Sequence, residues 1–544
     1  MTRSPTLRQE TLDRLQNEQF DVLVIGGGIT GAGIARDAAL RGLQVALLEK
    51  DDFASGTSSK SARLVHGGFR YLEQYQFGLV MSACAERHRL HRIAPRLVRP
   101  LAFTFPIYRR SSHSLAQITA GMWLYDVLAL FRNVQRHRIL RPEQVIQAEP
   151  LLERDGLIGA ACYYDCIADD ARLTLANVRA AQRRGAQAAN YAHVCGLLKN
   201  GGQIAGAEVV DRISGRPFAV RARVTVNAGG VWMDQITHLE NSGQRDQVRV
   251  NRGSHLILSR GKLALRDAVA FGSADGRRAM YAVPWRNTCI VGTTDVDHTG
   301  PLKDIAVSAA EAEFILISTQ KAFPQAHLTP DDVVSSFAGL RPLIAEEGKA
   351  AYQVSRDHHI FESEAGLISI SGGKLTTYRR MAQDVMVRVA KKLGKGQGRS
   401  QTDRVPLAEA SFDAQAELAA LAARGSGLDE EVLGHLMWTY GPEAPALLEQ
   451  IALDAGLGRR IAPGLPYICA EIGHAIEHEM AQTLSDVLIR RTHIIHEDAE
   501  QGLGCAAGVA ALMAPHLGWD AAEIERQMAA YRQQVALTRA YRQG

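Results

Sequence analysis

Three cationic side chains lie in or beside loops that follow apolar, strand-like segments. Arg341 follows VVSSFAGL, Lys374 lies within SISGGKLTTYRR, and Arg356 lies between them. In doubly wound sheets, ligands bind beyond the carboxyl ends of the strands, where Arg and Lys can hold an anionic group by charge-assisted hydrogen bonds. The spacing therefore predicts a site for an anionic small molecule. The alternative interpretation is that the three cations are surface charges that share no cavity.

A second set of polar side chains follows a glycine pair. Gly67 and Gly68 allow the backbone to approach a ligand closely, and Arg70 and Tyr71 come shortly after them. The polar ends of these two side chains could project into the same cavity as the three cations. The residues alone leave a ligand loop and an ordinary turn equally open.

The element that would position these groups is the segment 20–49, FDVLVIGGGITGAGIARDAALRGLQVALLE. Its short β-branched run is typical of a strand buried in a parallel sheet. Gly26, Gly28 and Gly31 then match G-x-G-x-x-G, the turn that places a pyrophosphate on the N-terminus of the following helix. A second strand follows this helix and ends at Glu49. This order of elements predicts dinucleotide binding.

Glu49 narrows the choice of dinucleotide. It lies about twenty residues beyond the glycine turn, where a carboxylate accepts a hydrogen bond from a ribose 2′-hydroxyl. A carboxylate there would repel the additional phosphate of NADP, so NAD and FAD stay open. A fingerprint so close to the N-terminus, followed by a long chain, suits a protein that encloses a large flavin cofactor. The local sequence does not decide between the two.

Composition excludes several other classes of protein. The 544 residues are 46% hydrophobic and 22% charged, which is ordinary for a globular protein of two or more domains. The net charge of +4 and the lack of nucleic-acid-binding motifs argue against nucleic acid as a partner. Seven cysteines, an odd number, favour a reducing compartment. Cys162 and Cys166 lack the second pair that a zinc site needs, so no metal site is expected.

The segment from Arg87 to Arg141 alternates basic clusters with apolar runs. Its longest apolar window, 115–131, is too short and too polar to span a bilayer, so we expect no transmembrane helix. Amphipathic elements of this kind lie at membrane surfaces, where Lys and Arg meet anionic lipid. The alternative is an insertion in a substrate domain whose basic face is solvated. After about Arg399 helical patterns replace the glycine-rich loops, which predicts a separate helical domain.

Several longer motifs follow one another along the chain. They are VIGGGITGAGIARDAALRGL, SSKSARLVHGGFRYLE, YDCIADDARLTLAN, NAGGVWMDQ, RGSHLIL, IVGTTDVDHTG, GLRPL, SRDHHI and GGKLTTYR, with LPYICAEIGHAIEHEMAQTLSDVLIRRTHI near the C-terminus. With these motifs the sequence resembles the FAD-dependent glycerol-3-phosphate dehydrogenases of the bacterial respiratory type. HGGFRYLE and GGKLTTYR are far more specific than the dinucleotide fingerprint, which a superfamily of amine and hydroxyacid oxidases shares.

The resemblance implies an α/β (α+β) fold, in which a Rossmann-type FAD-binding domain is interleaved with a substrate-binding β-sheet domain and followed by a C-terminal helical cap domain. The expected oxidoreductase region is 20–395, and the cap is expected at 400–544. Within the oxidoreductase region, the expected FAD-binding segments are about 20–92, 165–250 and 330–395, and the substrate-domain segments about 93–164 and 251–329.

The resemblance also implies the reaction. It is the oxidation of sn-glycerol 3-phosphate to dihydroxyacetone phosphate, with hydride transfer to FAD and electrons passed on to membrane quinone. The implied partners are this substrate, quinone and an anionic lipid surface, and a homodimer is compatible with it. The implied location is the cytoplasm, peripherally attached to the inner face of the cell membrane. The alternatives are a soluble glycerol-3-phosphate oxidase that uses oxygen, and an amine or amino-acid oxidase of the same superfamily.

Site residues carry over motif by motif. By this resemblance, Arg341 and Arg356 are the residues that bind the phosphate and hydroxyl groups of the substrate, the clamp. His255 is the expected base because the unperturbed pKa of histidine, about 6.5, is nearest neutrality; Lys374 could take that role or stabilise the alkoxide. The full set of implied catalytic residues is His255, Lys374, Arg341, Arg356, Tyr71 and Arg70. The implied FAD-binding residues are Gly26, Gly28, Gly31, Glu49, Thr57, Ser58, Ser59, His66, Gly67, Gly68, Gly229, Gly339, Gly373, Leu375 and Thr376.

Overall fold

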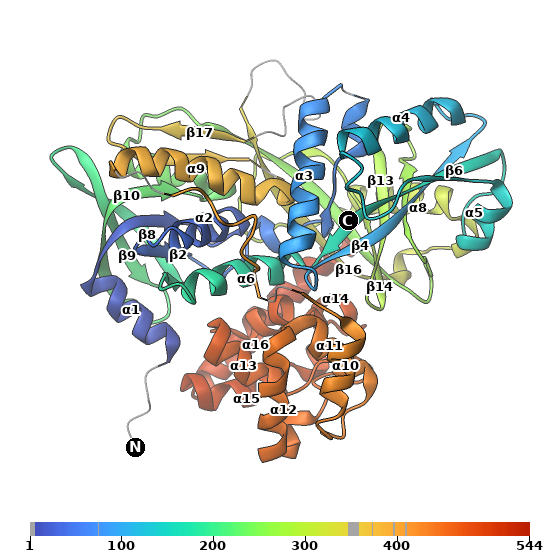
Figure 1. Cartoon of the computed structure of the whole chain (residues 1–544). Helices are drawn as coiled ribbons and strands as arrows, with labels where there is room; N and C mark the ends of the chain where they lie inside the picture. Colours follow the sequence, from blue (N-terminus) through green and yellow to red (C-terminus); the bar gives the residue numbers. More distant parts are fainter. Residues whose placement is uncertain are drawn as a thin grey trace.

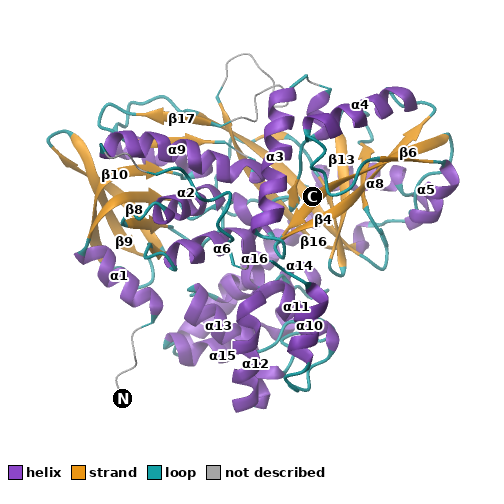
Figure 2. Cartoon of the chain, in the orientation of Figure 1, coloured by secondary structure: helices purple, strands orange, loops and turns teal. Residues whose placement is uncertain are grey.

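The computed structural model describes residues 6–73, 75–345, 358–372, 374–394, 398–408 and 411–543. Two β-sheet regions lie side by side, and a region of helices lies beneath them (Figure 1, Figure 2). Each sheet contains strands from distant parts of the sequence, so the chain passes repeatedly between the two. The predicted fold class, two interleaved sheet regions followed by a helical region, is confirmed.

The first sheet is built around β1 (Gln19–Ile25), which pairs in parallel with β10 (Pro217–Asn227) on one side and β2 (Val45–Leu48) on the other. The last four residues of β1 are buried, which explains the continuous apolar run in the sequence. The other described strands of this sheet are β7 (Gln187–Ala189), β8 (Ala192–Asn200), β9 (Gln203–Asp211), β17 (His359–Glu362) and β18 (Ile368–Ser371).

Helices cover both faces of this sheet. On one face, α2 (Ile29–Leu40) starts at the glycine turn and packs against α6 (Asp170–Gln182) and α9 (Tyr378–Leu393). On the other face, α1 (Leu7–Asn17) buries Leu12 and Leu15 in a cluster with strands β1 and β8–β10. From Leu7 onward, the N-terminal segment is thus a partly buried helix.

The second sheet carries the predicted base. Strand β11 (Val248–Ser259) is antiparallel to both β16 (Val333–Ile344) and β14 (Thr288–Gly292), so that His255 faces Phe337 in one neighbour and Gly292 in the other. The remaining described strands are β3 (Leu64–Val65), β4 (Val98–Tyr108), β5 (Arg138–Leu140), β6 (Leu157–Ala168), β12 (Ala268–Gly272), β13 (Ala279–Trp285) and β15 (Val296–Asp297). Its helices include α3 (Phe77–Ile93), α4 (Leu115–Leu128), α5 (Pro142–Ala148) and α8 (Ala309–Ala322).

The C-terminal region is helical, as predicted for the chain after about residue 399. Its helices pack around two buried apolar clusters of their own, which makes the region a separate packing unit (Figure 2). They are α10 (Ala414–Ala422), α11 (Glu430–Tyr440), α12 (Ala444–Leu453), α13 (Ala470–Glu479), the π-helical η10 (Asp486–Arg491), α14 (Ile494–Glu497), α15 (Leu503–Leu517) and α16 (Ala521–Arg539).

Among the described residues, no helix has both the length and the apolar character that a membrane crossing requires. The most apolar window of the sequence forms α4, which has 14 residues and is capped at Ser114 by a capping box with Gln117. A crossing helix needs about 20 apolar residues. The expectation that this window does not span a bilayer therefore agrees with the structure.

Candidate active site

The glycine turn after β1 leaves no room for side chains. Gly26 has a φ of +112°, and a Cβ there would lie 2.5 Å from the carbonyl oxygen of Ala228. A Cβ at Gly31 would overlap the carbonyl oxygen of Gly26. Gly28 occupies the N-cap position of α2, so the N–H groups of the first helical turn, which lack partners within the helix, point toward this end. The turn therefore forms the kind of cradle that a diphosphate occupies at a helix N-terminus.

The first turn of α2 is covered by a short polar helix. The backbone N–H of Ile29 donates to Ser58 Oγ at 2.9 Å, and Thr57 Oγ1 donates to the carbonyl of Leu340 at 2.5 Å. Thr57, Ser58 and Ser59 form this 3-10 turn, η1. The predicted residues 57–59 thus connect the glycine turn with strand β16 of the second sheet.

Glu49 lies at the end of β2, beside the glycine turn. Its carboxylate accepts hydrogen bonds from the N–H of Gly27 at 2.7 Å and of Asp51 at 2.9 Å. Burial raises the pKa of Glu49 to about 7, although both hydrogen bonds favour the carboxylate. A polar partner such as a pair of ribose hydroxyls would satisfy this carboxyl group further.

These segments line one cleft. Its wall is formed by residues 26, 28–30, 49, 51, 55–58, 61, 170, 228–232, 342, 372, 374 and 375. The predicted residues on its wall are Gly26, Gly28, Glu49, Thr57, Ser58, Gly229 and Leu375. A glycine cradle, a helix N-terminus and an acid at the end of the second strand are the donor set that a dinucleotide requires, so the residues present fit FAD.

The other predicted cofactor residues shape the backbone around this cleft. Gly339 lies so close to Lys60 that a Cβ would overlap the carbonyl oxygen of Lys60. His66 and Thr376 join their two loops, because the N–H of His66 donates to Thr376 Oγ1 at 3.0 Å and that hydroxyl donates back to the carbonyl of His66 at 3.2 Å. Gly373 lies outside the described residues.

The second glycine pair brings the cofactor cleft next to the predicted catalytic residues. Gly68 has a φ of +80°, and a Cβ there would overlap the ring of Tyr71 and lie 3.3 Å from Lys374 Nζ. Gly67 donates its N–H to Asp165 Oδ1 at 2.9 Å. The pair is therefore a close-packed loop between the two sheets rather than an ordinary surface turn.

Lys374 is buried against Tyr71. Its side chain lies with Nζ 4.4 Å from the ring centroid of Tyr71, and the residue is 8% exposed. Nζ has no hydrogen-bond partner among the residues that the structure describes. Burial lowers the pKa of Lys374, and the neighbouring Tyr71 side chain partly opposes this. Arg70 lies on the same ring, with its guanidinium carbon 5.1 Å from the centroid.

Arg341 lies in β16 opposite Asn251 of β11. Its guanidinium donates to Asn251 Oδ1 at 2.8 Å and to Thr293 Oγ1 at 3.0 Å, and it lies 3.7 Å from the carboxylate of Asp295. Gly253 provides the space for this side chain, because a Cβ there would overlap Arg341 Nη2. Arg356, the other predicted member of the clamp, lies outside the described residues.

His255 lies in the middle of β11. It is 3% exposed, and its ring stacks on that of Phe337 with centroids 4.8 Å apart. Neither ring nitrogen has a hydrogen-bond partner in the described part of the chain. Burial, together with the charge of Arg341, lowers the pKa of His255 to about 3. The imidazole is therefore neutral at pH 7 and is available as a proton acceptor.

Asp295 acts electrostatically on two of the predicted catalytic residues, Arg341 and Arg70. It pairs with Arg341 and also affects the pKa of Arg70. Burial lowers the pKa of Arg70, but the effects of Tyr71, Tyr281 and Asp295 are larger and raise the pKa. Buried polar groups are normally hydrogen-bonded, so an unpartnered one is a candidate contact for a polar ligand. His255 Nδ1 and Nε2 and Lys374 Nζ are such groups.

Sequence reasoning missed two acids that hold the glycine pair and the preceding loop in place. Asp165 of β6 accepts the N–H of Gly67 and forms a buried ion pair with Arg87 of α3. Ser61 donates its N–H and its hydroxyl to Asp170 at the start of α6. Both acids lie in the motif YDCIADDAR, whose run of carboxylates within a strand-to-helix turn is the signal that could have identified them.

Comparisons with known proteins agree with this geometry. The family model described as FAD dependent oxidoreductase matches residues 21–379, and that of the C-terminal domain of alpha-glycerophosphate oxidase matches 400–524. The chain is 37% identical to a glycerol-3-phosphate dehydrogenase of Synechocystis sp. (95% of this chain, 96% of the relative). It is 39% identical to glycerol-3-phosphate dehydrogenase 2 of Mycobacterium tuberculosis (98% and 90%) and 33% identical to an aerobic glycerol-3-phosphate dehydrogenase of Staphylococcus aureus (96% and 96%).

A solved structure is similar over nearly the whole chain. It is the glycerol-3-phosphate dehydrogenase of Bacillus halodurans complexed with FAD, with a TM-score of 0.82, 29% identity and 98% of each chain covered. The two sheets, the glycine cradle and these matches define an FAD-dependent oxidoreductase with a helical C-terminal domain. More narrowly, the chain belongs to the glycerol-3-phosphate dehydrogenase family, and its cofactor is FAD.

Proposed function

We propose that this protein oxidises sn-glycerol 3-phosphate to dihydroxyacetone phosphate and passes the electrons to membrane quinone. Family membership supports the substrate, because the relatives are named for glycerol 3-phosphate. The observations that carry the proposal are two buried polar groups without a partner among the described residues, His255 and Lys374, and the guanidinium of Arg341, whose charge acts on His255. A small phosphorylated alcohol supplies hydroxyl groups for the first two and an anion for the third.

Bound FAD supplies the hydride acceptor for the hydrogen on C2 of the substrate. In the proposed mechanism, Arg341 binds the phosphate through its planar fork, and Arg356 completes the clamp. This binding orients C2 toward the flavin and excludes water from the cavity. His255 takes the C2 hydroxyl proton on a ring nitrogen, and Lys374 stabilises the negative charge that develops on the oxygen.

Substrate binding would also strengthen His255 as a base. Its pKa is low because of burial and because of the positive charge on Arg341. A phosphate dianion bound to Arg341 neutralises that charge, so the pKa of His255 rises toward its ordinary value in the complex. Lys374 is the alternative base, since burial lowers its pKa as well. Tyr71 and Arg70 would then hold Lys374 in place by ring contacts.

The proposed FAD contacts follow the cleft. The diphosphate would lie on the N-terminus of α2 at Gly26, Gly28 and Gly31, and the adenosine ribose would meet Glu49. The reacting ring would lie toward Gly67 and Gly68, whose close packing brings the backbone and Lys374 to the same point. The supporting residues are Thr57, Ser58, Ser59, His66, Gly229, Gly339, Gly373, Leu375 and Thr376.

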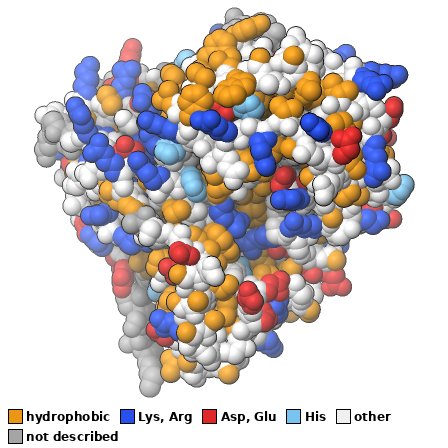
Figure 3. All heavy atoms as spheres, turned by 45° about the vertical axis from the view of Figure 1, so that its right-hand side comes forward, with side chains coloured by type: hydrophobic (Ala, Val, Ile, Leu, Met, Phe, Trp, Pro, Cys, Tyr) orange, Lys and Arg blue, Asp and Glu red, His pale blue; other side chains and the backbone are white. Residues whose placement is uncertain are grey.

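An exposed apolar surface supports contact with the membrane. It comprises Trp123, Leu124, Val127, Leu130, Phe131 and Val134 from α4 and the turn after it, with Tyr75, Phe77 and Met81 near the start of α3. We call it the α3–α4 surface. Figure 3 shows apolar side chains gathered along the corresponding upper edge of the molecule. Arg132 and Arg136 are exposed beside it, a composition suited to anionic lipid and to a quinone within the bilayer.

The basic residues between Arg87 and Arg141 do not form one membrane-facing set, contrary to the interpretation of that segment as a single patch. Arg96 is buried and donates to the carbonyls of Trp438 and Thr439. Arg99 stacks on Trp438. Both therefore face the C-terminal domain, whereas Arg109 and Arg110 are exposed. The physical reason is that residues 96 and 99 lie against α11 of the C-terminal domain, whereas residues 109 and 110 follow the other end of β4.

The proposed reaction is tested under anaerobic conditions with the purified holoenzyme. Glycerol 3-phosphate should bleach the flavin absorbance, whereas glycerol should not, because the binding energy of the phosphate orients C2. Adding a soluble quinone analogue should restore the absorbance faster than air does. Bleaching by glycerol or by amino acids would refute the substrate, and faster recovery in air would replace the quinone with oxygen as acceptor.

The membrane contact is tested with vesicles. The variant Leu130→Ser/Phe131→Ser should bind anionic vesicles about fivefold more weakly for each side chain removed, since each loses part of its buried apolar area. The matched control is Leu453→Ser, an equally apolar side chain that is 91% exposed in the helical domain. Unchanged vesicle binding in the double variant would contradict the role of the α3–α4 surface.

A further inference from the structure

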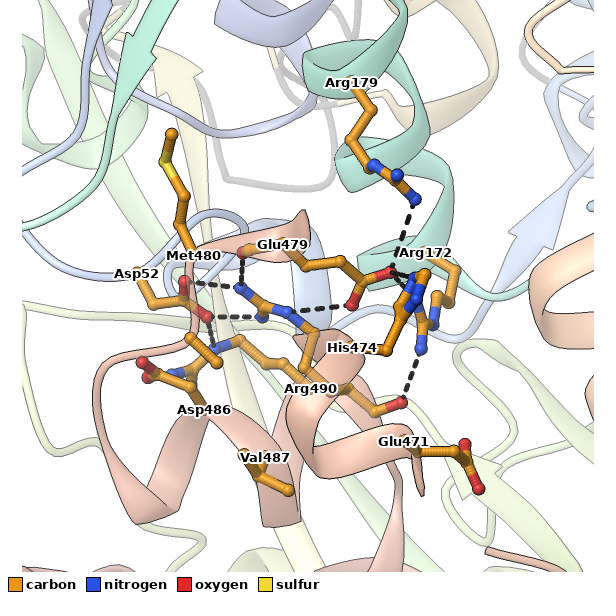
Figure 4. Close-up of polar contacts among 12 residues, drawn as sticks. Asp52, Arg172, Arg179, Glu471, His474, Glu479, Met480, Asp486, Val487 and Arg490 are labelled. Atoms are coloured by element: carbon orange, nitrogen blue, oxygen red, sulfur yellow. Dashed lines mark hydrogen bonds and ion pairs between the residues drawn. The ribbon is translucent and has the colours of Figure 1, made fainter. Parts of the chain in front are cut away.

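A buried group of charges joins the C-terminal domain to the cofactor side of the molecule (Figure 4). Asp52 lies three residues beyond Glu49 in the loop that leaves β2, and its side chain is fully buried. Its carboxylate accepts hydrogen bonds from the Nη atoms of Arg491 at 2.7 and 2.9 Å and from Nε of Arg490 at 2.6 Å. Both arginines end η10 of the C-terminal domain.

Hydrogen bonds at both ends connect the loop that contains Asp52 to the glycine turn. At its start, Glu49 accepts the N–H of Gly27 at 2.7 Å. At its end, Ala54 donates its N–H to the carbonyl of Gly27 at 3.1 Å. The same loop continues into the residues 55–58 on the wall of the cofactor cleft. A shift of Asp52 therefore moves both the ribose acceptor and the diphosphate cradle.

A neighbouring residue provides a second connection. Tyr191 donates its N–H to the carbonyl of Asp51 at 2.8 Å, and its hydroxyl donates to Asp486 Oδ1 at 2.7 Å. Asn190 donates to Asp52 Oδ1 at 3.0 Å and to the carbonyl of Met480 at 2.8 Å. The C-terminal domain thus holds the loop both directly and through the turn that supports it.

Each acid of this group is paired with arginines within the buried interface. Asp52 pairs with Arg490 and Arg491, and Asp486 pairs with Arg490. Glu479 is in contact with Arg172, Arg179 and Arg491; Figure 4 shows the acids with the arginines 172, 179 and 490. Buried ion pairs add little net stability, because the cost of desolvation offsets their attraction. Removing one partner is nevertheless costly, because it leaves an unpaired charge in the interior. Such a group therefore fixes geometry more than it adds stability. The arginines hold the pKa of Asp52 at about 2 although burial alone would raise it.

We propose that Asp52, Arg490 and Arg491 are positioning residues for FAD and that the C-terminal domain retains the cofactor. By docking on Asp52, the domain keeps the loop 49–54 in the conformation that receives the ribose and the diphosphate. A loop ordered in advance loses less conformational freedom on binding, so FAD binds more tightly. By linkage, bound FAD strengthens the docking of the domain to the same degree.

The test measures FAD affinity in full-length variants. Arg491→Gln and Asp52→Asn should each raise the Kd for FAD at least tenfold, measured by the fluorescence of released flavin. Tyr191→Phe removes a single hydroxyl and should raise it two- to fivefold without unfolding the chain. The matched control is Arg96→Gln, which removes another buried arginine from the same domain interface, away from the cofactor loop; its Kd should stay within twofold of the wild type.

Thermal denaturation with and without FAD separates positioning from general stability. In Arg491→Gln, Asp52→Asn and Tyr191→Phe, the difference in Tm between holoprotein and apoprotein should shrink, whereas in Arg96→Gln both Tm values should fall together. If the first three variants keep the wild-type Kd and the wild-type Tm difference, the charges only join two domains and the proposal is wrong. The readouts need no substrate, so failure of the proposed reaction would leave this result intact.

Discussion

Replacing Arg341 by Ala tests the phosphate clamp at its best-described member. The guanidinium lies between Asn251, Thr293 and Asp295, which fix its direction. Removing it leaves these groups in place but deletes the cation that would meet the phosphate. Because the side chain is only 22% exposed, its charge acts in a partly desolvated cavity.

The magnitude follows from the kind of contact. Truncating one partner of a hydrogen-bonded charge pair costs about 2–5 kcal/mol of binding free energy. The value of kcat/KM for glycerol 3-phosphate should therefore fall by about 30- to 4000-fold. Arg341→Lys should recover only part of this loss, since an ammonium lacks the planar fork. Reactivity toward glycerol, which has no phosphate, should change little.

The same substitution should shift a pH profile. The positive charge of Arg341 is one cause of the low pKa of His255, so the pKa rises when that charge is removed. Activity requires neutral His255 and is lost as pH falls through its pKa, so the acid limb of kcat/KM should move to higher pH in Arg341→Ala. Flavin content and Tm must match those of the wild type. An unchanged kcat/KM with normal flavin content would refute the clamp, and an unshifted acid limb would refute the coupling to His255.

Three further outcomes are expected. His255→Asn should slow flavin reduction by glycerol 3-phosphate by about 10²–10⁴-fold with FAD still bound, as stopped-flow absorbance would measure; a loss of only a few-fold would move the role of base to Lys374. Lys374→Met should lower kcat more than it raises KM if the charge acts on the developing alkoxide, and a change in KM alone would contradict that role. Gly31→Ala should abolish FAD binding, because its Cβ would overlap the Gly26 carbonyl; purification of a yellow holoprotein would contradict the cradle.

Local sequence was sufficient where the relevant interactions are local. The glycine turn, the following helix and the acid at residue 49 were predictable because all of them lie within thirty residues and depend on φ, on close approach and on a helix N-terminus. The functional roles of residues in these elements stay predictions, because the fold shows where they lie and not what they bind.

The environment of His255 could not be predicted from its neighbours in sequence. Its burial comes from Phe337, which follows 82 positions later, and its lowered pKa comes partly from Arg341. Arg96 and Arg99 show the same limit. In the sequence they belong to a cluster of basic residues, some of which are exposed. In the structure, Arg96 is buried and donates to the carbonyls of Trp438 and Thr439, and Arg99 stacks on the ring of Trp438. Charge patterning does not reveal which side a strand will face.

The pair Arg490-Arg491 is the strongest example of this limit. In the sequence it follows an apolar helical stretch, where two arginines at a helix end are typically solvated and interact with the helix dipole. In the structure, both side chains instead turn toward an aspartate that lies more than four hundred positions earlier. Only a carboxylate that is itself buried can compensate for desolvating two guanidinium groups, and Asp52 is buried because the cofactor loop turns at that point. The docking of the helical domain and the conformation of the loop that contains Asp52 therefore depend on each other.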